Sequence, residues 1–256
     1  MNILDLNKKF YKCYKGKKGI IGVTEQARPI YFYGVEKTDY PRLIVQSSIH
    51  AREYITAYLT LKLINRACKT LQKGSVYFIP ILNPDGVRIA LNENPLYKAN
   101  ARGVDLNVNF DARWGTGEKN LREKATENYI GEHSFSERET RAIREFTYFV
   151  KPDFTISYHA KGEEIYYEFF QEGLEKARDE RLANIISSCT GYKVKPTLNS
   201  AGGYKDWCIE KLKIPALTIE VGSDDLSHPI GKRHLRKIYR QNKLVIEKAI
   251  EYFLEK

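Results

Sequence analysis

Four short runs of apolar or alternating residues, separated by segments with helical periodicity, constrain the fold more than any other feature. The strand-like runs cover residues 42–49, 75–82, 153–158 and 215–221. The helical patterns cover residues 54–71, 136–150, 173–190 and 235–256, and Ser136 and Glu139 have the spacing of a capping box at the start of the second. Because several strand-like runs are almost wholly apolar, we predict an α/β fold with a mostly parallel or mixed sheet covered by helices on both faces.

The length and composition fit one large domain. The chain has 256 residues, of which 42% are hydrophobic, and a domain of this size buries roughly 70–75% of its unfolded surface. No repeat, linker or low-complexity block divides it, so we expect a single domain over residues 1–256. The polar stretch 82–133 has little periodicity, and loops of that length usually carry function.

Targeting signals and cysteines predict a cytoplasmic protein. The N-terminal residues contain no apolar stretch of signal-peptide length, and no segment reaches the roughly 18 apolar residues of a membrane helix. The four cysteines are far apart and fit neither a C-x-x-C metal pattern nor a disulfide scaffold. We therefore expect reduced thiols and no membrane partner.

The charge balance predicts an anionic partner. The chain carries 42 Lys and Arg against 32 Asp and Glu, a net charge of +10. Its lysines are scattered, and no nucleic-acid module accompanies them, so we expect no nucleic-acid partner. An acidic substrate is one interpretation and a solvated basic face is the other. Nothing in the sequence specifies an oligomeric state.

Polar residues with catalytic potential follow or end each strand-like run. These are His50, the sequence NPDG at 83–86, His159 and Glu220. If the strands are parallel neighbours, these residues gather at the carboxyl edge of the sheet, where open α/β sheets bind ligands. Taken singly, each histidine has a structural alternative, and NPDG can be an ordinary tight turn.

Three of these side chains have the composition of a catalytic metal site. His50 and Glu53, at positions i and i+3, share one face as a helix begins, and His159 completes a His₂Glu set that leaves the fourth zinc position open. Glu220 lies between Ile219 and Val221, so its carboxylate is expected to be buried. A buried carboxylate needs a charged partner or a raised pKa, and a raised pKa suits a general base. The alternative for Glu220 is an outward-facing residue paired with a surface lysine.

The motifs together resemble those of the zinc carboxypeptidases of the funnelin type. They occur in order along nearly the whole chain: HARE (50–53), LNPDGV (82–87), GVDLNVNF (103–110), SYHAKGEEIYYEF (157–169), GGYKDW (202–207) and TIEVG (218–222). The resemblance implies a three-layer α/β/α fold around a mixed, mainly eight-stranded sheet, and one Zn²⁺ ion held by His50, Glu53 and His159. It also implies that Glu220 is the catalytic carboxylate and that Asp105 orients His50.

The same resemblance predicts further site residues and some departures. Arg102 is the candidate for steadying the oxyanion. Asn107 matches the asparagine of an Asn-Arg pair that clamps a substrate carboxylate in the family, but Val108 replaces the arginine. The position of a family tyrosine holds Leu198, for which the nearby Tyr204 is the candidate substitute.

Lys205 and the flanking motifs point to the substrate. Lys205 matches the position that sets side-chain specificity in the family, and a cation there predicts an acidic substrate group. KANARGVDLN and GGYKDW also resemble the bacterial branch that cuts peptidoglycan stem peptides between γ-D-glutamate and diaminopimelate. We therefore expect a cytoplasmic zinc metallopeptidase acting on an anionic peptide or muropeptide. The alternatives are a conventional metallocarboxypeptidase, a zinc deacylase of N-acyl amino acids, and a peptide-binding protein that retained the fold without turnover.

Overall fold

One mixed sheet of eight strands forms the centre of the molecule in the computed structural model, which describes residues 1–125, 127–197 and 199–255. The strand order is β1-β2-β4-β3-β5-β8-β6-β7. The strands span β1 Lys17–Val23, β2 Pro29–Glu36, β3 Arg42–Ser47, β4 Ser75–Ile79, β5 Phe154–His159, β6 Glu164–Tyr166, β7 Lys193–Lys195 and β8 Ala216–Glu220. The predicted α/β class and the eight-stranded mixed sheet are confirmed.

The four central strands, β4, β3, β5 and β8, run parallel to one another, whereas the pairs β1–β2, β2–β4 and β6–β8 are antiparallel. All four strand-like runs predicted from the sequence are these central strands. They are buried along almost their whole length, which explains why their sequences are nearly continuous apolar runs.

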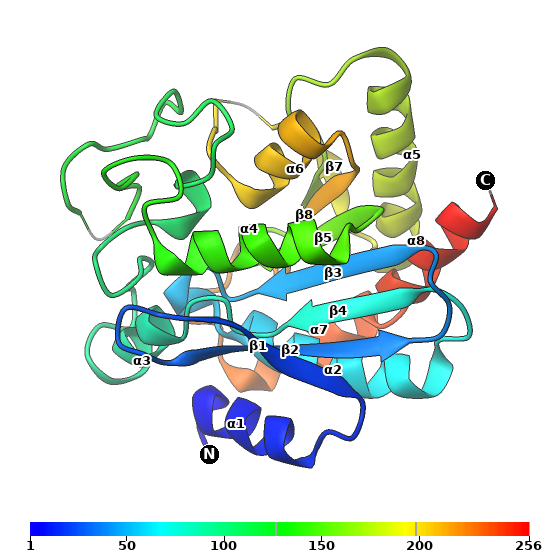
Figure 1. Cartoon of the computed structure of the whole chain (residues 1–256), viewed down its shortest axis with the longest axis horizontal. Helices are drawn as coiled ribbons and strands as arrows, with labels where there is room; N and C mark the ends of the chain where they lie inside the picture. The colour runs from blue at the N-terminus through cyan, green and yellow to red at the C-terminus, as the bar shows by residue number, and fades with distance from the viewer. Residues whose placement is uncertain (126, 198, 256) are drawn as a thin grey trace.

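Helices cover both faces of the sheet (Figure 1). Their bounds are α1 Ile3–Cys13, α2 Ile55–Thr70, α3 Pro84–Asn92, α4 Arg138–Val150, α5 Gly173–Thr190, α6 Tyr204–Leu212, α7 Leu235–Asn242 and α8 Val245–Leu254. One core joins residues of α2, α5, α7 and α8 to one face of the sheet, and a second core joins α4 and α6 to the other. The three-layer arrangement is therefore confirmed.

Two predicted helix features differ from the structure. The pattern 235–256 forms two helices, α7 and α8, rather than one. The capping box predicted for Ser136 and Glu139 is absent, because α4 begins after Glu137 and the Ser136 hydroxyl donates to Glu137 Oε1 at 2.8 Å instead.

The stretch 82–133 contains one helix that the sequence pattern did not indicate, α3, which begins directly after Asn83. The Asn83 side chain accepts a hydrogen bond from Gly86 N at 2.9 Å, so it caps the helix rather than forming only a turn. In the described part of the chain, no helix combines the length and hydropathy needed to cross a bilayer.

Candidate active site

The parallel strands bring the predicted site residues to one edge of the sheet. His159 ends β5 and Glu220 ends β8, and the two residues are partners in the strand register. His50 follows β3 by three residues and precedes a short 3₁₀ helix, Ala51–Glu53, that carries Glu53. Segments more than 100 residues apart in sequence thus meet where the carboxyl ends of parallel strands lie together.

Buried hydrogen bonds fix the loop that carries His50. Asn83 Nδ2 donates to the carbonyl oxygens of Ile49 at 3.1 Å and Ala99 at 3.0 Å. Ala51 N donates to Lys98 O at 3.0 Å. The asparagine of NPDG therefore ties the His50 loop to the loop that contains Lys98, which is a structural role for that motif.

His50, Glu53 and His159 form one compact buried group. Glu53 Oε1 lies 2.9 Å from His50 Nδ1, Glu53 Oε2 lies 3.2 Å from His159 Nδ1, and the two Nδ1 atoms are 3.2 Å apart. A tetrahedral zinc site with Zn–N bonds of 2.0–2.1 Å separates neighbouring ligand atoms by about 3.3 Å. The donor set and its spacing therefore fit a zinc ion. Among the described residues, it is the only group of three or more His, Cys, Asp or Glu side chains close enough to hold a metal.

The electrostatics of this group favour a cation. Burial opposes protonation of His50, but the negative charges of Glu53 and Asp105 raise its pKa to about 9. Burial lowers the pKa of His159, which favours the neutral imidazole that a metal requires. Because Glu53 and Asp105 stabilise positive charge at His50 in the form of a proton, they also stabilise it in the form of a metal ion.

Asp105 contacts His50 from the side away from Glu53, as the resemblance implied. Its Oδ1 lies 3.2 Å from His50 Nε2, and its Oδ2 lies 2.8 Å from Lys98 Nζ. Although burial opposes it, the charges of Lys98 and His50 hold the pKa of Asp105 well below its usual range. An ionised Asp105 at this distance favours the tautomer that keeps the proton on His50 Nε2, which leaves Nδ1 free for a metal.

Glu220 is half-buried at the wall of the same site. Its Oε2 atom is shielded from solvent and has no hydrogen-bond partner among the described residues. Burial, followed by the negative charge of Glu53, raises the pKa of Glu220 well above its usual range. A raised pKa makes this carboxylate a stronger proton acceptor than an exposed one.

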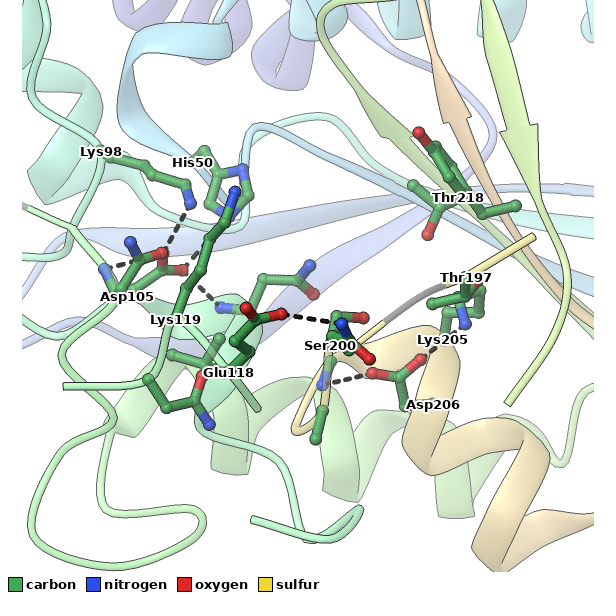
Figure 2. Close-up of a pocket in the computed structure, with 18 of the residues that line it drawn as sticks. His50, Lys98, Asp105, Glu118, Lys119, Thr197, Ser200, Lys205, Asp206 and Thr218 are labelled. Carbon is green, nitrogen blue, oxygen red and sulfur yellow. Dashed lines mark hydrogen bonds and ion pairs between the residues drawn. The ribbon is translucent and has the colours of Figure 1, made fainter. Parts of the chain in front are cut away.

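A cavity of about 520 Å³ opens in front of these residues (Figure 2). His50, Lys98, Asp105 and Glu220 line it. Two loops also contribute mostly polar residues to the lining: Glu118, Lys119, Asn120, Asn128, Thr197, Asn199, Ser200 and Ala201.

Lys98, rather than Arg102, is the cation beside the candidate metal group. Arg102 has a 42% exposed side chain, lies 3.1 Å from Glu132 Oε1, and does not line the cavity. This placement gives no support to the oxyanion role predicted for Arg102, which stays a prediction. Lys98 is half-buried in the cavity wall, and Asp105 raises its pKa although burial opposes this, so its ammonium group stays charged. The sequence signal for Lys98 is its place four residues before Arg102 in KANAR.

The predicted substrate-binding residues have different placements. Asn107 and Val108 line the cavity. Because position 108 holds a valine, it offers no positive charge to a substrate carboxylate there. Tyr204 is fully buried, and its hydroxyl lies 2.9 Å from Thr147 Oγ1 on α4. Tyr204 does not line the cavity, and its substrate-binding role stays a prediction without structural support. Leu198, where the family tyrosine was sought, lies outside the described residues.

Lys205 also lines the cavity, but its charge already has a partner. Its Nζ atom donates to Asp206 Oδ1 and to the Glu168 carbonyl oxygen, both at 2.6 Å. The residue is 6% exposed. The specificity role of Lys205 stays a prediction. Asp206 neutralises the positive charge that was expected to attract an acidic substrate group.

Comparisons with known proteins agree with this site. The family model of zinc carboxypeptidases matches residues 16–244. The chain is 28% identical over 227 residues, 75% of its length, to γ-D-glutamyl-L-diamino acid endopeptidase 1 of Lysinibacillus sphaericus, and it spans 57% of that protein.

Solved structures share the fold. Bovine thrombin-activatable fibrinolysis inhibitor, solved with tick carboxypeptidase inhibitor, superposes with a TM-score of 0.85 at 19% identity, covering 99% of this chain and 94% of that one. The murein-tripeptide amidase MpaA of Escherichia coli O157 gives a TM-score of 0.65 at 18% identity, covering 93% and 92%. With a family model that matches from residue 16 to residue 244 and a buried His₂Glu group at the carboxyl edge of its sheet, the chain belongs to the zinc carboxypeptidase family.

Proposed function

We propose that this protein is a zinc metallopeptidase that hydrolyses an amide bond in peptidoglycan-derived stem peptides, between γ-D-glutamate and diaminopimelate. The observation that carries the peptidase proposal is the meeting of His50, Glu53 and His159 with Glu220 at one cavity. The substrate is supported by the name of the Lysinibacillus relative and by Val108, which provides no charge at the position where the family clamps a C-terminal carboxylate. A cytoplasmic location stays a prediction.

The residues around the cavity have complementary roles in amide hydrolysis. Zinc held by His50, Glu53 and His159 would supply a Lewis acid that polarises the scissile carbonyl and lowers the pKa of water. Glu220 accepts the proton of the attacking water and then donates it to the amine that leaves as the C–N bond breaks. Lys98 stabilises the negative charge that develops on the carbonyl oxygen, and Asp105 holds His50 in the required tautomer.

A product analysis tests this proposal. The zinc-loaded protein is incubated with L-Ala-γ-D-Glu-diaminopimelate and, separately, with a hippuryl amino acid, and the products are identified by mass. Release of diaminopimelate from the first peptide, with little turnover of the second, is the expected result.

Other outcomes favour other functions. Cleavage of the hippuryl substrate alone would contradict the proposed substrate and favour a conventional carboxypeptidase. Cleavage of neither would contradict the peptidase proposal and favour a deacylase or a binding protein, which N-acyl amino acids and peptide-binding measurements then distinguish.

A further inference from the structure

The cavity wall contains three lysines, and only one of them lacks a counter-ion. Lys98 is paired with Asp105 at 2.8 Å and Lys205 with Asp206 at 2.6 Å. Lys119 lines the same cavity, and its ammonium group makes no hydrogen bond or ion pair with any residue that the structure describes. The one uncompensated cation of the wall is therefore Lys119.

The backbone around Lys119 is held in place rather than loose. Asn120 N donates to Gly117 O at 3.0 Å, which closes a turn with Lys119 at its tip. Glu118 joins this turn to the facing loop twice, because Glu118 N donates to Asn199 O at 3.0 Å and Asn199 Nδ2 donates to Glu118 Oε2 at 2.8 Å. In Figure 2 the Lys119 side chain extends from this turn into the cavity, toward the side where His50 lies.

Two polar atoms of the cavity lining have no partner in the described part of the chain: one belongs to Asn120, next to Lys119 in the same turn, and the other to Thr197, which lies across the cavity beside Lys205 (Figure 2). Asn120 Nδ2 and Thr197 Oγ1 are shielded from solvent, line the cavity, and make no hydrogen bond with the described residues. Buried donors without partners are costly, so a ligand that accepts hydrogen bonds here gains from satisfying them. The Lys119 ammonium group and the amide of the adjacent Asn120 are both donors, which matches the acceptor oxygens of a carboxylate.

We propose that Lys119, with Asn120 beside it, binds a carboxylate of the substrate that lies beyond the scissile bond. Lys119 would thereby take the role of the family arginine that Val108 replaces. This inference rests on the proposed function and names the residue that recognises the acidic end of its substrate. Lys119 belongs to the turn closed by Asn120 N and Gly117 O, whereas Lys98 and Glu220 hold the oxyanion and proton-transfer roles of the proposed mechanism. Its role is therefore binding and specificity, with no part in proton transfer.

The test measures binding separately from turnover. L-Ala-γ-D-Glu-diaminopimelate and the same peptide with its diaminopimelate carboxylates amidated are titrated calorimetrically into the zinc-loaded Glu220→Gln protein. We expect the acid to bind about tenfold more tightly than the amide, the lower end of what a hydrogen bond to a charged group contributes. Lys119→Met in the same background should remove this preference by weakening the acid alone.

Two matched variants serve as controls. Lys119→Arg keeps the cation and should keep the preference, while Lys124→Met removes an exposed lysine of the same segment that does not line the cavity and should change neither affinity. Equal binding of acid and amide by the parent protein, no binding of either, or a preference that survives Lys119→Met would overturn the inference. Failure of the proposed function is scored separately, as absence of cleavage by the unsubstituted protein.

Discussion

Glu220 lies opposite His159 in the parallel register that joins β8 to β5, so a candidate proton acceptor and a candidate metal ligand end neighbouring strands on the same face of the sheet. Backbone pairing fixes this relationship, because residues opposed in a ladder point their side chains in the same direction. The catalytic arrangement therefore depends on the sheet itself, and less on the loops around it.

Glu220→Gln should separate catalysis from metal binding. We expect kcat to fall by on the order of 10²–10⁴-fold, the usual contribution of a general acid–base group, because glutamine cannot accept the proton of water. The zinc content, measured by elemental analysis, should be unchanged, since Glu220 is not among the three grouped ligands. Undiminished activity of the variant would refute the role of Glu220.

Lys98 and Arg102 form a natural pair of substitutions. Lys98→Met should lower kcat by roughly 10²–10³-fold, as loss of one oxyanion-stabilising group does, with Lys98→Arg retaining part of the activity. Arg102→Ala should change activity by less than about twofold, because a surface ion pair contributes little. Steady-state kinetics on the cleaved peptide measures kcat for both variants. A larger loss of kcat for Arg102→Ala than for Lys98→Met would favour Arg102 as the oxyanion residue.

Glu139 predicts a pH dependence of stability. It is fully buried, and burial first of all raises its pKa to about 7 from an ordinary value of 4.5. Its Oε2 accepts from Asn100 Nδ2 at 3.3 Å, whereas its Oε1 has no partner among the described residues. The folded state therefore holds a proton that the unfolded state has released, so stability is greatest below pH 4.5 and is lost as the pH rises through about 7.

Glu139→Gln mimics the protonated acid and should remove this loss. We expect the variant to exceed the unsubstituted protein in free energy of unfolding by at most on the order of 3 kcal/mol at pH 8, with the difference shrinking toward pH 5. Urea unfolding at both pH values measures it. A variant less stable than the parent at pH 8 would show that the ionised carboxylate is stabilising.

The buried pair of Lys205 and Asp206 predicts a structural cost. Lys205→Ala leaves Asp206 buried without its counter-ion, so we expect a loss of about 3–5 kcal/mol in the free energy of unfolding. A double variant, Lys205→Ala with Asp206→Ala, should recover part of that loss. If the single variant is as stable as the parent and instead loses its preference for acidic substrates, the specificity role of Lys205 stands.

Sequence patterning identified the centre of the sheet and missed its edges. The four parallel strands read as apolar runs because both of their faces are covered. β1 and β2 have more exposed residues, and β6 and β7 have only three residues each, too short for a periodic signal. The division of the last helix between Asn242 and Val245 also left no mark in the apolar pattern, since both helices pack against the same core.

Sequence patterning placed residues better at strand ends than in the loops. His50, Glu53, His159 and Glu220 are placed by the carboxyl ends of β3, β5 and β8 and meet as predicted. Arg102 and Lys98 lie in one loop whose path follows from contacts distant in sequence, such as Asn83 with Ala99. Charge alone did not distinguish the two residues, and only the fold shows which one faces the cavity.

Zinc stoichiometry tests the central claim most directly. Metal-free protein is titrated with Zn²⁺ by calorimetry, and bound zinc is quantified after dialysis, for the unsubstituted chain, for His159→Ala and for Asp85→Asn as a buried acidic control away from the metal group. We predict one zinc ion per chain for the unsubstituted and control proteins, and loss of tight binding for His159→Ala. Absence of stoichiometric zinc in the unsubstituted protein, or full retention by His159→Ala, would contradict a metal site built from His50, Glu53 and His159.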